Sequence, residues 1–457
     1  MAMTGASSPG KVLILGGYII VEGHNVGISI GTTARFETRV VSEQNSPDEK
    51  CRVQFFSPQF KKEYIFECTV KDGAEPIVLV TQIEGSSSPF LYYSVLYAVA
   101  AVVSQGGDIR KTVTLELLAD NDFYSQRNYL EAEGRQVTVA NLRTLPHHLP
   151  LVGDVSKTGL GSSAAMTTSA VACLYSFLRS IDFNDSKELE LIHRTAQIAH
   201  SVAQGKIGSG FDVYTATYGT CLYRRFPAQC IEKIMNGTEP PKSVGVINFS
   251  DCINLEKEWV ERVPFRLPLG LKLVLGDVHQ GGTGTPGMVS KVMAWRKSVA
   301  NNPESLWNLL SENNENYVKS LRLLISDAEE KPKQYMDAVE TLKHVVIAQH
   351  TPKNESERLW IEAATLASKS RRYLREMGHA ASVEIEPNVL STLLDATFAI
   401  PGVFAVGCPG AGGYDAVFAL VIGDETCAVI EEFWERYENI HICPLMVRED
   451  AKGLIFS

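Results

Sequence analysis

The stretch Lys157–Met166 constrains the fold of this 457-residue chain more than any other. Gly159 and Gly161 flank one leucine, and two serines then lead into a run of small residues that ends near Leu178. This order predicts a tight loop that opens a helix. A helix start has unpaired N–H groups and a partial positive charge, so it suits a phosphate group. A glycine-rich turn with a serine N-cap explains the same residues, and the stretch alone does not decide between the two.

Two familiar nucleotide-binding patterns are absent from this stretch. It lacks the G-x-x-x-x-G-K-[ST] order of a Walker loop. It also lacks the third glycine of a dinucleotide-binding turn. The hydroxyl groups of Ser162 and Ser163 can still contact a phosphate or a hydrated magnesium ion.

Composition narrows the class of protein. Hydrophobic residues make up 45% of the chain and charged residues 21%, which is typical of a globular protein. The net charge of −10 without a strong basic block argues against nucleic-acid binding, so an anionic substrate would need local positive charge. The nine cysteines show no metal-binding spacing, which favours a reducing compartment. With no signal peptide and no apolar run long enough to span a bilayer, we expect a cytoplasmic protein without a membrane partner.

Strand and helix patterns divide the chain into two parts. Strands are predicted at 11–15, 26–30, 32–40, 52–56, 63–70, 111–118 and 219–224, with helices at 89–104, 162–178 and 186–204. Residues 231–243, with two adjacent prolines, resemble a linker. Further strands at 244–249, 272–277, 403–407, 416–422 and 445–447 enclose a mostly helical section from 288 to 378. The sequence therefore predicts a two-domain α+β protein, with domains at 1–230 and 244–457 and a helical insertion in the second.

A second glycine-rich segment, Gln204–Val213, contains Lys206, Ser209, Gly210 and Asp212. Its backbone N–H groups and its lysine can approach an anion, and Asp212 can accept a proton or orient a hydroxyl group. A simple helix-to-strand connection with a surface aspartate is the alternative.

Three other segments show related features. In Asp277–Met288, Thr283 or Thr285 can cap a helix start that suits an anion, although capping alone explains them. Gly407–Ala416 is either a tight turn or a site of close approach to a ligand. Lys11, which follows Gly10 at a strand start, either points into a cleft or is solvated at a sheet edge.

Taken together, the motifs resemble a known family. Pro9–Lys11, Gly159–Ala164 and Pro409–Gly413 are similar, in text and order, to the three motifs of the GHMP kinase superfamily. Within it the chain most resembles the eukaryotic phosphomevalonate kinases, in particular those of fungi. That likeness lies in residues 10–18, 157–165, 204–213 and 285–292.

The resemblance implies a fold and an activity. It implies an N-terminal domain like ribosomal protein S5 domain 2, a ferredoxin-like C-terminal domain, and an active site between them. It also implies transfer of a phosphoryl group from ATP, with Mg²⁺, to (R)-5-phosphomevalonate in isoprenoid and sterol biosynthesis, by a monomer or weak dimer. The alternatives are mevalonate kinase, diphosphomevalonate decarboxylase and a non-catalytic regulator of the same fold.

The resemblance also assigns roles to residues. It implies that Lys11 and Asp212 are catalytic and that Ser163 lies near the metal ion. Mevalonate kinases carry a metal-binding glutamate upstream of the aspartate, and Ser201 and His200 stand near that place here. The implied contacts to the ATP phosphates are Lys157, Gly159, Leu160, Gly161, Ser162, Ser163 and Ala164. Those to the acceptor substrate are Lys206, Ser209, Gly210, Thr283, Thr285, Lys291 and Gly412, with Arg296 as a further candidate.

Overall fold

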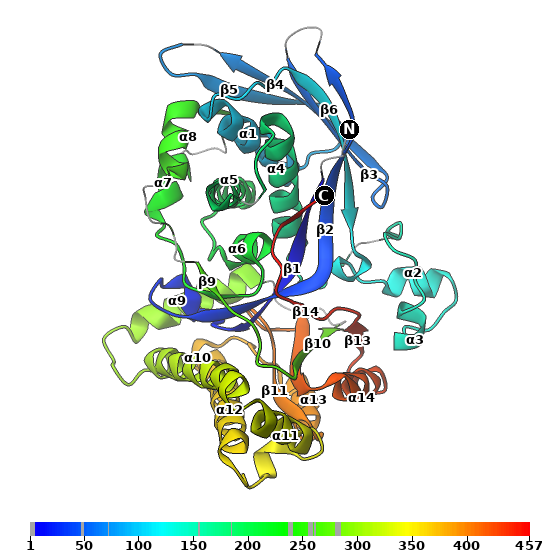
Figure 1. Ribbon diagram of the computed structural model, residues 1–457, viewed down its shortest axis with the longest axis vertical. Coiled ribbons are helices and arrows are strands. Elements are labelled where there is room, and N and C mark those ends of the chain that lie inside the picture. Colours follow the sequence, from blue (N-terminus) through cyan, green and yellow to red (C-terminus); the bar gives the residue numbers. More distant parts are fainter. Residues whose placement is uncertain are drawn as a thin grey trace.

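The chain forms two lobes joined by long strands (Figure 1). The structure is a computed structural model and describes residues 5–46, 50–71, 73–153, 156–183, 185–235, 241–254, 259, 262–278 and 285–457. The larger lobe contains a wide sheet with helices on one face. The smaller lobe contains a second sheet and a layer of long helices. Both β1 and β2 extend from the large lobe down to the junction between the lobes.

The sheet of the large lobe has eleven strands within the described residues. Its main order is β15-β1-β2-β6-β3-β4-β5-β8, with β7 and β14 paired to β2, and β9 paired to β7. Strands β1 and β2 pair antiparallel, whereas β3 and β6 pair parallel. The bounds are β1 (Gly5–Leu15), β2 (Gly27–Asn45), β3 (Cys51–Ser57), β4 (Lys62–Lys71), β5 (Ile77–Glu84), β6 (Lys111–Ala119), β7 (Cys221–Tyr223), β8 (Ser243–Gly245), β9 (Val263–Pro264), β14 (Glu449–Asp450) and β15 (Ile455–Phe456).

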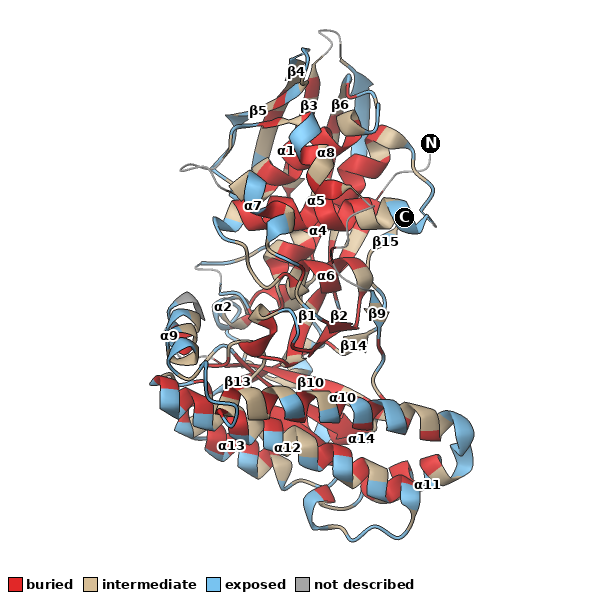
Figure 2. Ribbon diagram, turned by 90° about the vertical axis from the view of Figure 1, so that its left-hand side faces the viewer, coloured by how far each residue is buried: buried red, intermediate tan, exposed pale blue. Residues whose placement is uncertain are grey.

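Buried helices cover this sheet, and they hold the segments that build the site. Helix α1 begins with a proline and is apolar on nearly all sides, because α4, α5 and the sheet enclose it. Figure 2 shows α4 and α5 as almost continuously buried. The helices of this lobe are α1 (Pro89–Ser104), α2 (Arg127–Ala132), α3 (Val139–Leu142), α4 (Ser162–Arg179), α5 (Ser186–Gln204), α6 (Phe211–Tyr218), α7 (Gln229–Met235) and α8 (Val246–Ile253), with short 3-10 turns η1 (Ile19–Val21) and η2 (Asn121–Phe123).

The small lobe is an antiparallel sheet covered by helices. Its strands are β10 (Leu271–Val278), β11 (Val403–Gly407), β12 (Ala416–Ile422) and β13 (Ile442–Leu445), in the order β11-β12-β10-β13. Buried Trp360 packs edge-on against Phe404 with ring centroids 5.5 Å apart, which joins the helical layer to the sheet. The helices are α9 (Thr285–Ser298), α10 (Leu306–Glu330), α11 (Pro332–Leu342), η3 (Ile347–Gln349), α12 (Glu355–Ala381), α13 (Asn388–Phe398) and α14 (Asp424–Glu435).

The structure confirms the α+β class and the three helices predicted in the first half, and it corrects several local predictions. The strands predicted at 26–30 and 32–40 are one strand, β2. The strand predicted at 244–249 was mostly wrong, because β8 ends at Gly245 and α8 begins at Val246. Its apolar residues occur at helical spacing, with Val246, Phe249 and Ile253 on the buried face. Helix α6 was missed because glycines precede it.

Four strands from beyond residue 230 return to the sheet of the large lobe. Strand β8 pairs with β5 and β9 with β7, while β14 and β15 at the end of the chain pair with β2 and β1. The division at 1–230 and 244–457 stays a prediction, and a sheet-based division would give these strands to the first lobe.

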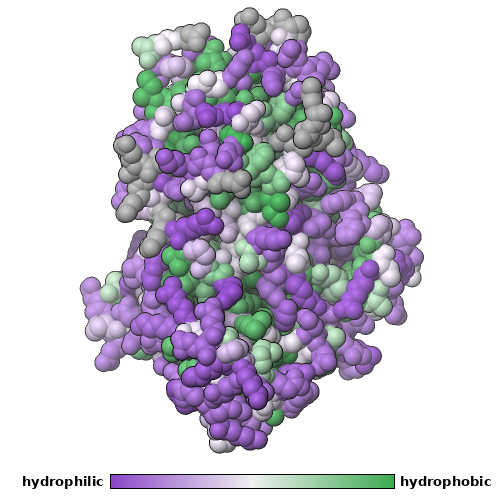
Figure 3. All heavy atoms as spheres, viewed as in Figure 1, coloured by the Kyte–Doolittle hydropathy of each residue, from purple (hydrophilic) through white to green (hydrophobic). Residues whose placement is uncertain are grey.

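The face of the molecule shown in Figure 3 has no broad apolar patch. That face is mostly hydrophilic, and its hydrophobic side chains form separate small groups. Within the described ranges, no helix is both long enough and apolar enough to cross a bilayer.

Candidate active site

A cavity of about 510 Å³ lies where β1, the starts of α4 and α6, and the connection between β11 and β12 come together. Three of the glycine-rich segments singled out in the sequence line it. The predicted site residues among its lining are Lys11, Lys157, Gly159, Leu160, Gly161, Ser162, Ser163, Lys206, Ser209, Gly210 and Asp212. The fold thus brings together residues about 200 positions apart.

Lys11 is bound directly to the loop before α4. Its backbone N–H donates to the carbonyl oxygen of Leu160 at 2.9 Å, and its Nζ donates to that of Gly159 at 2.9 Å. Gly161 caps α4 in the left-handed conformation with φ 77°. A Cβ atom at Gly161 would lie 2.8 Å from Lys11 Cε, so the side chain of Lys11 occupies the space that glycine leaves free.

The Lys11 ammonium group lies among features that shift its pKa in opposite directions. Burial lowers its pKa from the ordinary value, while the carboxylates of Asp212 and Asp415 act to raise it. The Nζ atom also lies 5.3 Å from the ring centroid of Phe211. The site therefore holds one lysine between the predicted phosphate loop and two carboxylates, one from each lobe.

Asp212 lies in the first turn of α6, which Gly210 begins with φ 85°. A side chain at Gly210 would collide with Phe226 and Tyr223, so the tight packing fixes the start of this helix. The Oδ1 atom of Asp212 accepts a hydrogen bond from the N–H of Val213 at 3.0 Å. Its Oδ2 atom lies 3.9 Å from Nδ1 of His200.

His200 connects two predicted site residues, and the sequence analysis gave it no role. Its Nε2 atom lies 3.1 Å from Ser163 Oγ, and the Nε2 atom of Gln204 lies 3.3 Å from the same ring nitrogen. Burial lowers the pKa of His200, so a neutral imidazole is favoured there. The helical spacing of His200 and Gln204, one turn apart before Gly205, was the available signal.

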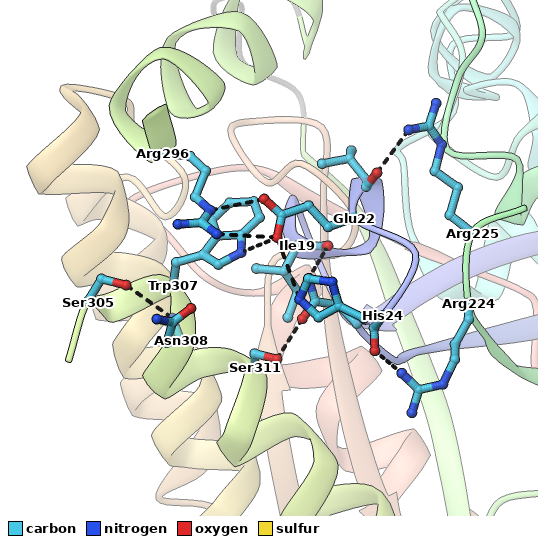
Figure 4. A network of polar contacts seen from close by, with 12 residues as sticks. Ile19, Glu22, His24, Arg224, Arg225, Arg296, Ser305, Trp307, Asn308 and Ser311 are labelled. Atoms are coloured by element: carbon cyan, nitrogen blue, oxygen red, sulfur yellow. Dashed lines mark hydrogen bonds and ion pairs between the residues drawn. The ribbon is translucent and has the colours of Figure 1, made fainter. Parts of the chain in front are cut away.

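The loop of residues 18–25 borders the cavity and is fixed by side chains from distant elements (Figure 4). Glu22 accepts a hydrogen bond from Arg296 Nε at 3.0 Å and another from Trp307 Nε1 at 3.0 Å. Arg296 also stacks over the ring of Trp307 at 5.1 Å. Arg296, which the sequence suggested for the acceptor, is therefore already paired with Glu22.

The remaining predicted residues lie in different settings. Ala164 is buried behind the loop, and Lys291 is exposed on α9. Gly412 packs against the backbone of Ile385, so a side chain there would collide with it. None of these three is among the described residues that line the cavity. Thr283 lies outside the described residues, and Thr285 begins α9 with its side chain outside the description.

Three further lining residues were not predicted. Tyr18 has a φ of 64° and donates a hydrogen bond from its Oη atom to the carbonyl oxygen of Ala411 at 2.5 Å, which ties the two lobes together. Asp415 enters from the small lobe, and Arg225 follows β7. The sequence gave little signal for them, because each owes its place to tertiary packing.

Comparison with known proteins gives consistent results. Residues 132–220 match the model of the GHMP kinases N terminal domain. The chain is 33% identical to a peroxisomal phosphomevalonate kinase of Arabidopsis thaliana, across 98% of this chain and 95% of that protein. It is 32% identical to a phosphomevalonate kinase of Gibberella zeae, across 98% of this chain and 95% of that protein. The phosphomevalonate kinase of Streptococcus pneumoniae, solved with phosphomevalonate and AMPPNP, has a similar fold, with a TM-score of 0.55, 14% identity and coverage of 97% and 99%.

Proposed function

Because the chain belongs to the phosphomevalonate kinase family of the GHMP kinases, we propose how its cavity residues divide the work of phosphoryl transfer. The chain is a phosphotransferase of the mevalonate pathway whose acceptor is itself a phosphate group. One observation carries the proposal. Lys11 is fixed to the loop before α4 and lies in one cavity with Asp212.

The loop before α4 binds the phosphates of ATP. The first turn of α4 directs unpaired N–H groups and the positive end of the helix dipole toward the cavity. Lys157 adds positive charge beside this turn, and Ser162 and Ser163 add hydroxyl groups. The backbone of Gly159, Leu160 and Gly161 lies along the same wall, and the role of the buried Ala164 is to support that backbone.

Lys11 and Asp212 position and neutralise the reacting groups. The acceptor phosphate is already largely ionised near neutral pH, so it needs alignment more than removal of a proton. Phosphoryl transfer depends mainly on positioning and on electrostatic stabilisation of its spread negative charge. The ammonium group of Lys11 supplies positive charge at the wall of the cavity, and Asp212 holds the acceptor phosphate or its remaining proton in line.

Ser163 and Asp212 fit a magnesium site. Mg²⁺ prefers oxygen ligands and, if bound here, would offset the negative charge of the phosphate groups. The hydroxyl group of Ser163 and the carboxylate of Asp212 line one cavity and would be suitable donors to the ion. His200 bonds to the Ser163 hydroxyl group and therefore fixes its orientation.

Fewer structural contacts support the residues that we propose bind the acceptor, phosphomevalonate. Lys206, Ser209 and Gly210 line the cavity beside Asp212 and are proposed to bind phosphomevalonate. Lys291, Thr283, Thr285 and Gly412 stay as predicted contacts. A monomer or weak dimer is proposed, as is a cytoplasmic location, although the Arabidopsis relative is named peroxisomal.

The first test is ADP release from ATP and Mg²⁺ with mevalonate, 5-phosphomevalonate or 5-diphosphomevalonate as separate acceptors. We expect turnover with 5-phosphomevalonate alone. Turnover with another acceptor would leave the proposed ATP-phosphate contacts unchanged, but the residues proposed to bind phosphomevalonate would have to be assigned to that acceptor instead. ATP binding without ADP release from any mixture would favour a non-catalytic role.

A further inference from the structure

Two consecutive arginines after β7 bind the loop of residues 18–25, and their surroundings differ. Figure 4 shows Arg224 and Arg225 on one side of this loop, and Arg296 and Trp307 on the other. Arg224 is about half exposed, donates to the carbonyl oxygen of His24 and forms an ion pair with Glu315 at 2.7 Å. Arg225 is less exposed and lines the cavity.

Arg225 binds three backbone carbonyl oxygens. Its Nη1 donates to Val21 at 2.9 Å, its Nε to Gly208 at 3.1 Å and its Nη2 to Ile207 at 3.2 Å. A guanidinium group has five N–H donors, of which Nε carries one and each Nη carries two. Two donors therefore remain, one on each Nη atom. The three carbonyl groups hold this planar, fork-shaped group in a fixed orientation.

The charge of Arg225 lacks a counterion within the described part of the chain. Arg224 pairs with Glu315 and Arg296 with Glu22, but no described carboxylate lies within ion-pair distance of Arg225. Burial lowers its pKa, which shows that the surroundings disfavour the bare charge. The three carbonyl oxygens stabilise the Arg225 charge, but none of them carries a full negative charge. An anion that enters the cavity would supply the missing charge.

The acceptor substrate has two anionic ends, a phosphate and a carboxylate. In the proposed function, the phosphate lies with the ATP phosphates near α4, Lys11 and Asp212. Arg225 is anchored instead to residues 21, 207 and 208, none of which belongs to the loop before α4. Two parallel N–H donors match the two oxygens of a carboxylate. We infer that Arg225 binds the carboxylate of the acceptor and so sets its distance from the phosphate loop.

This inference rests on the proposed function, and a substrate-by-protein cycle tests it. Wild type, R225Q and R225K are assayed with 5-phosphomevalonate and with its carboxamide analogue, which keeps the phosphate and lacks the carboxylate charge. In wild type, the analogue should lower kcat/KM by roughly 10- to 100-fold, the range for one lost charged hydrogen-bond pair. In R225Q the acid should lose a similar factor and the analogue much less. R225K should recover part of the loss, because it restores charge without the fork.

The matched control is R224Q, which changes the neighbouring arginine that has its own carboxylate partner. It should discriminate between acid and analogue as wild type does. If R225Q lowers kcat/KM equally for both acceptors, Arg225 only supports the loop and the inference is wrong. The KM for ATP distinguishes a specific loss of acceptor binding from a general loss of structure. It should be the same in R225Q as in wild type. Absence of turnover in wild type would instead contradict the proposed function.

Discussion

Two walls of the cavity are held by different kinds of contact. The phosphate wall, residues 157–163 with Lys11, is built from backbone hydrogen bonds and from glycines with positive φ. The loop of residues 18–25 is held by side chains, and Glu22 reaches partners 274 and 285 positions away. Backbone geometry follows from a local pattern of residues. Side-chain pairs between distant elements exist only once the chain has folded, so the two walls should respond differently to substitution.

The largest effect is expected where the phosphate wall meets the catalytic pair. Asp212→Asn keeps the size of the side chain but removes the charge that we propose aligns the acceptor and the metal ion. Lys11→Ala removes the buried positive charge. We expect kcat to fall by roughly 1,000-fold in each variant, with ATP-analogue affinity within about 3-fold of wild type. ADP release and calorimetric titration measure these quantities. Unchanged turnover in both variants would remove their assigned roles.

Gly161→Ala tests whether the phosphate wall depends on the backbone. The new Cβ atom would press on Lys11 Cε, and a φ of 77° is unfavourable for alanine. We expect kcat to fall by roughly 10- to 100-fold and the free energy of unfolding to fall by about 1–2 kcal/mol. Gly106→Ala is the control, because Gly106 has a φ of 71° and no atom within 4 Å of its added Cβ. That variant should lose stability but keep its activity; equal losses of activity would refute the explanation.

Glu22→Gln tests the side-chain wall. The change removes the charge that pairs with Arg296 while the side chain keeps its length, and Trp307 retains an oxygen acceptor. The pair is only partly shielded from water, so we expect a modest effect, a rise of roughly 10-fold in KM for phosphomevalonate. The KM for ATP should stay the same. Steady-state kinetics with each substrate varied in turn will measure the two KM values separately. A parallel rise in both would contradict a specific effect on phosphomevalonate.

A variant of Glu315 provides the comparison for Glu22→Gln. Glu315 also pairs with an arginine that binds this loop, but both members of that pair are more exposed than Glu22 and Arg296. Glu315→Gln should change KM for phosphomevalonate by less than about 2-fold, as expected of an exposed ion pair. Combining Glu22→Gln with Arg296→Gln should cost little more than either change alone, because each removes the same interaction.

The last prediction concerns stability and its dependence on pH, with no expected effect on the contrast between the two walls. Asp277, buried at the end of β10, has its pKa raised from 3.8 to about 6, mainly by burial. The folded state therefore binds this proton more tightly than the unfolded state does. The resulting stabilisation is complete below the unfolded pKa and is lost as the pH rises through about 6. Asp277→Asn should thus gain stability relative to wild type between pH 4 and 7, by up to about 3 kcal/mol. Urea unfolding at each pH measures this, and a constant difference would contradict it.

Much of the phosphate wall could be predicted from the sequence. The order of Gly159, Gly161 and Ser162 predicted a loop that opens a helix, and α4 begins at Ser162. Lys11 was the harder prediction, because a lysine after a glycine at a strand start can equally be solvated at a sheet edge. The three motifs in order implied a catalytic role for it, which stays a prediction, and the structure adds that its side chain fills the space beside Gly161.

The other wall could not be predicted from local patterns. Arg296 was suggested as a contact to the phosphate or carboxylate of the acceptor, but in the structure it is paired with Glu22. His200 and Arg225 carry no motif, and their positions depend on how α5 and β7 pack against neighbouring elements. Sequence spacing predicts which residues share a helix face, but it does not predict which distant side chain they meet.

The sequence by itself determined the α+β class, the helices that support the site, and the glycine-rich loop that opens α4. These features depend on local conformational preference and on apolar periodicity, both of which short segments contain. Tertiary structure alone decided the return of the last strands to the first sheet, the pairing of Glu22 with Arg296, and the position of Arg225 against three carbonyl oxygens. Each of these depends on burial and on contacts between distant residues, and these arise only when the whole chain packs.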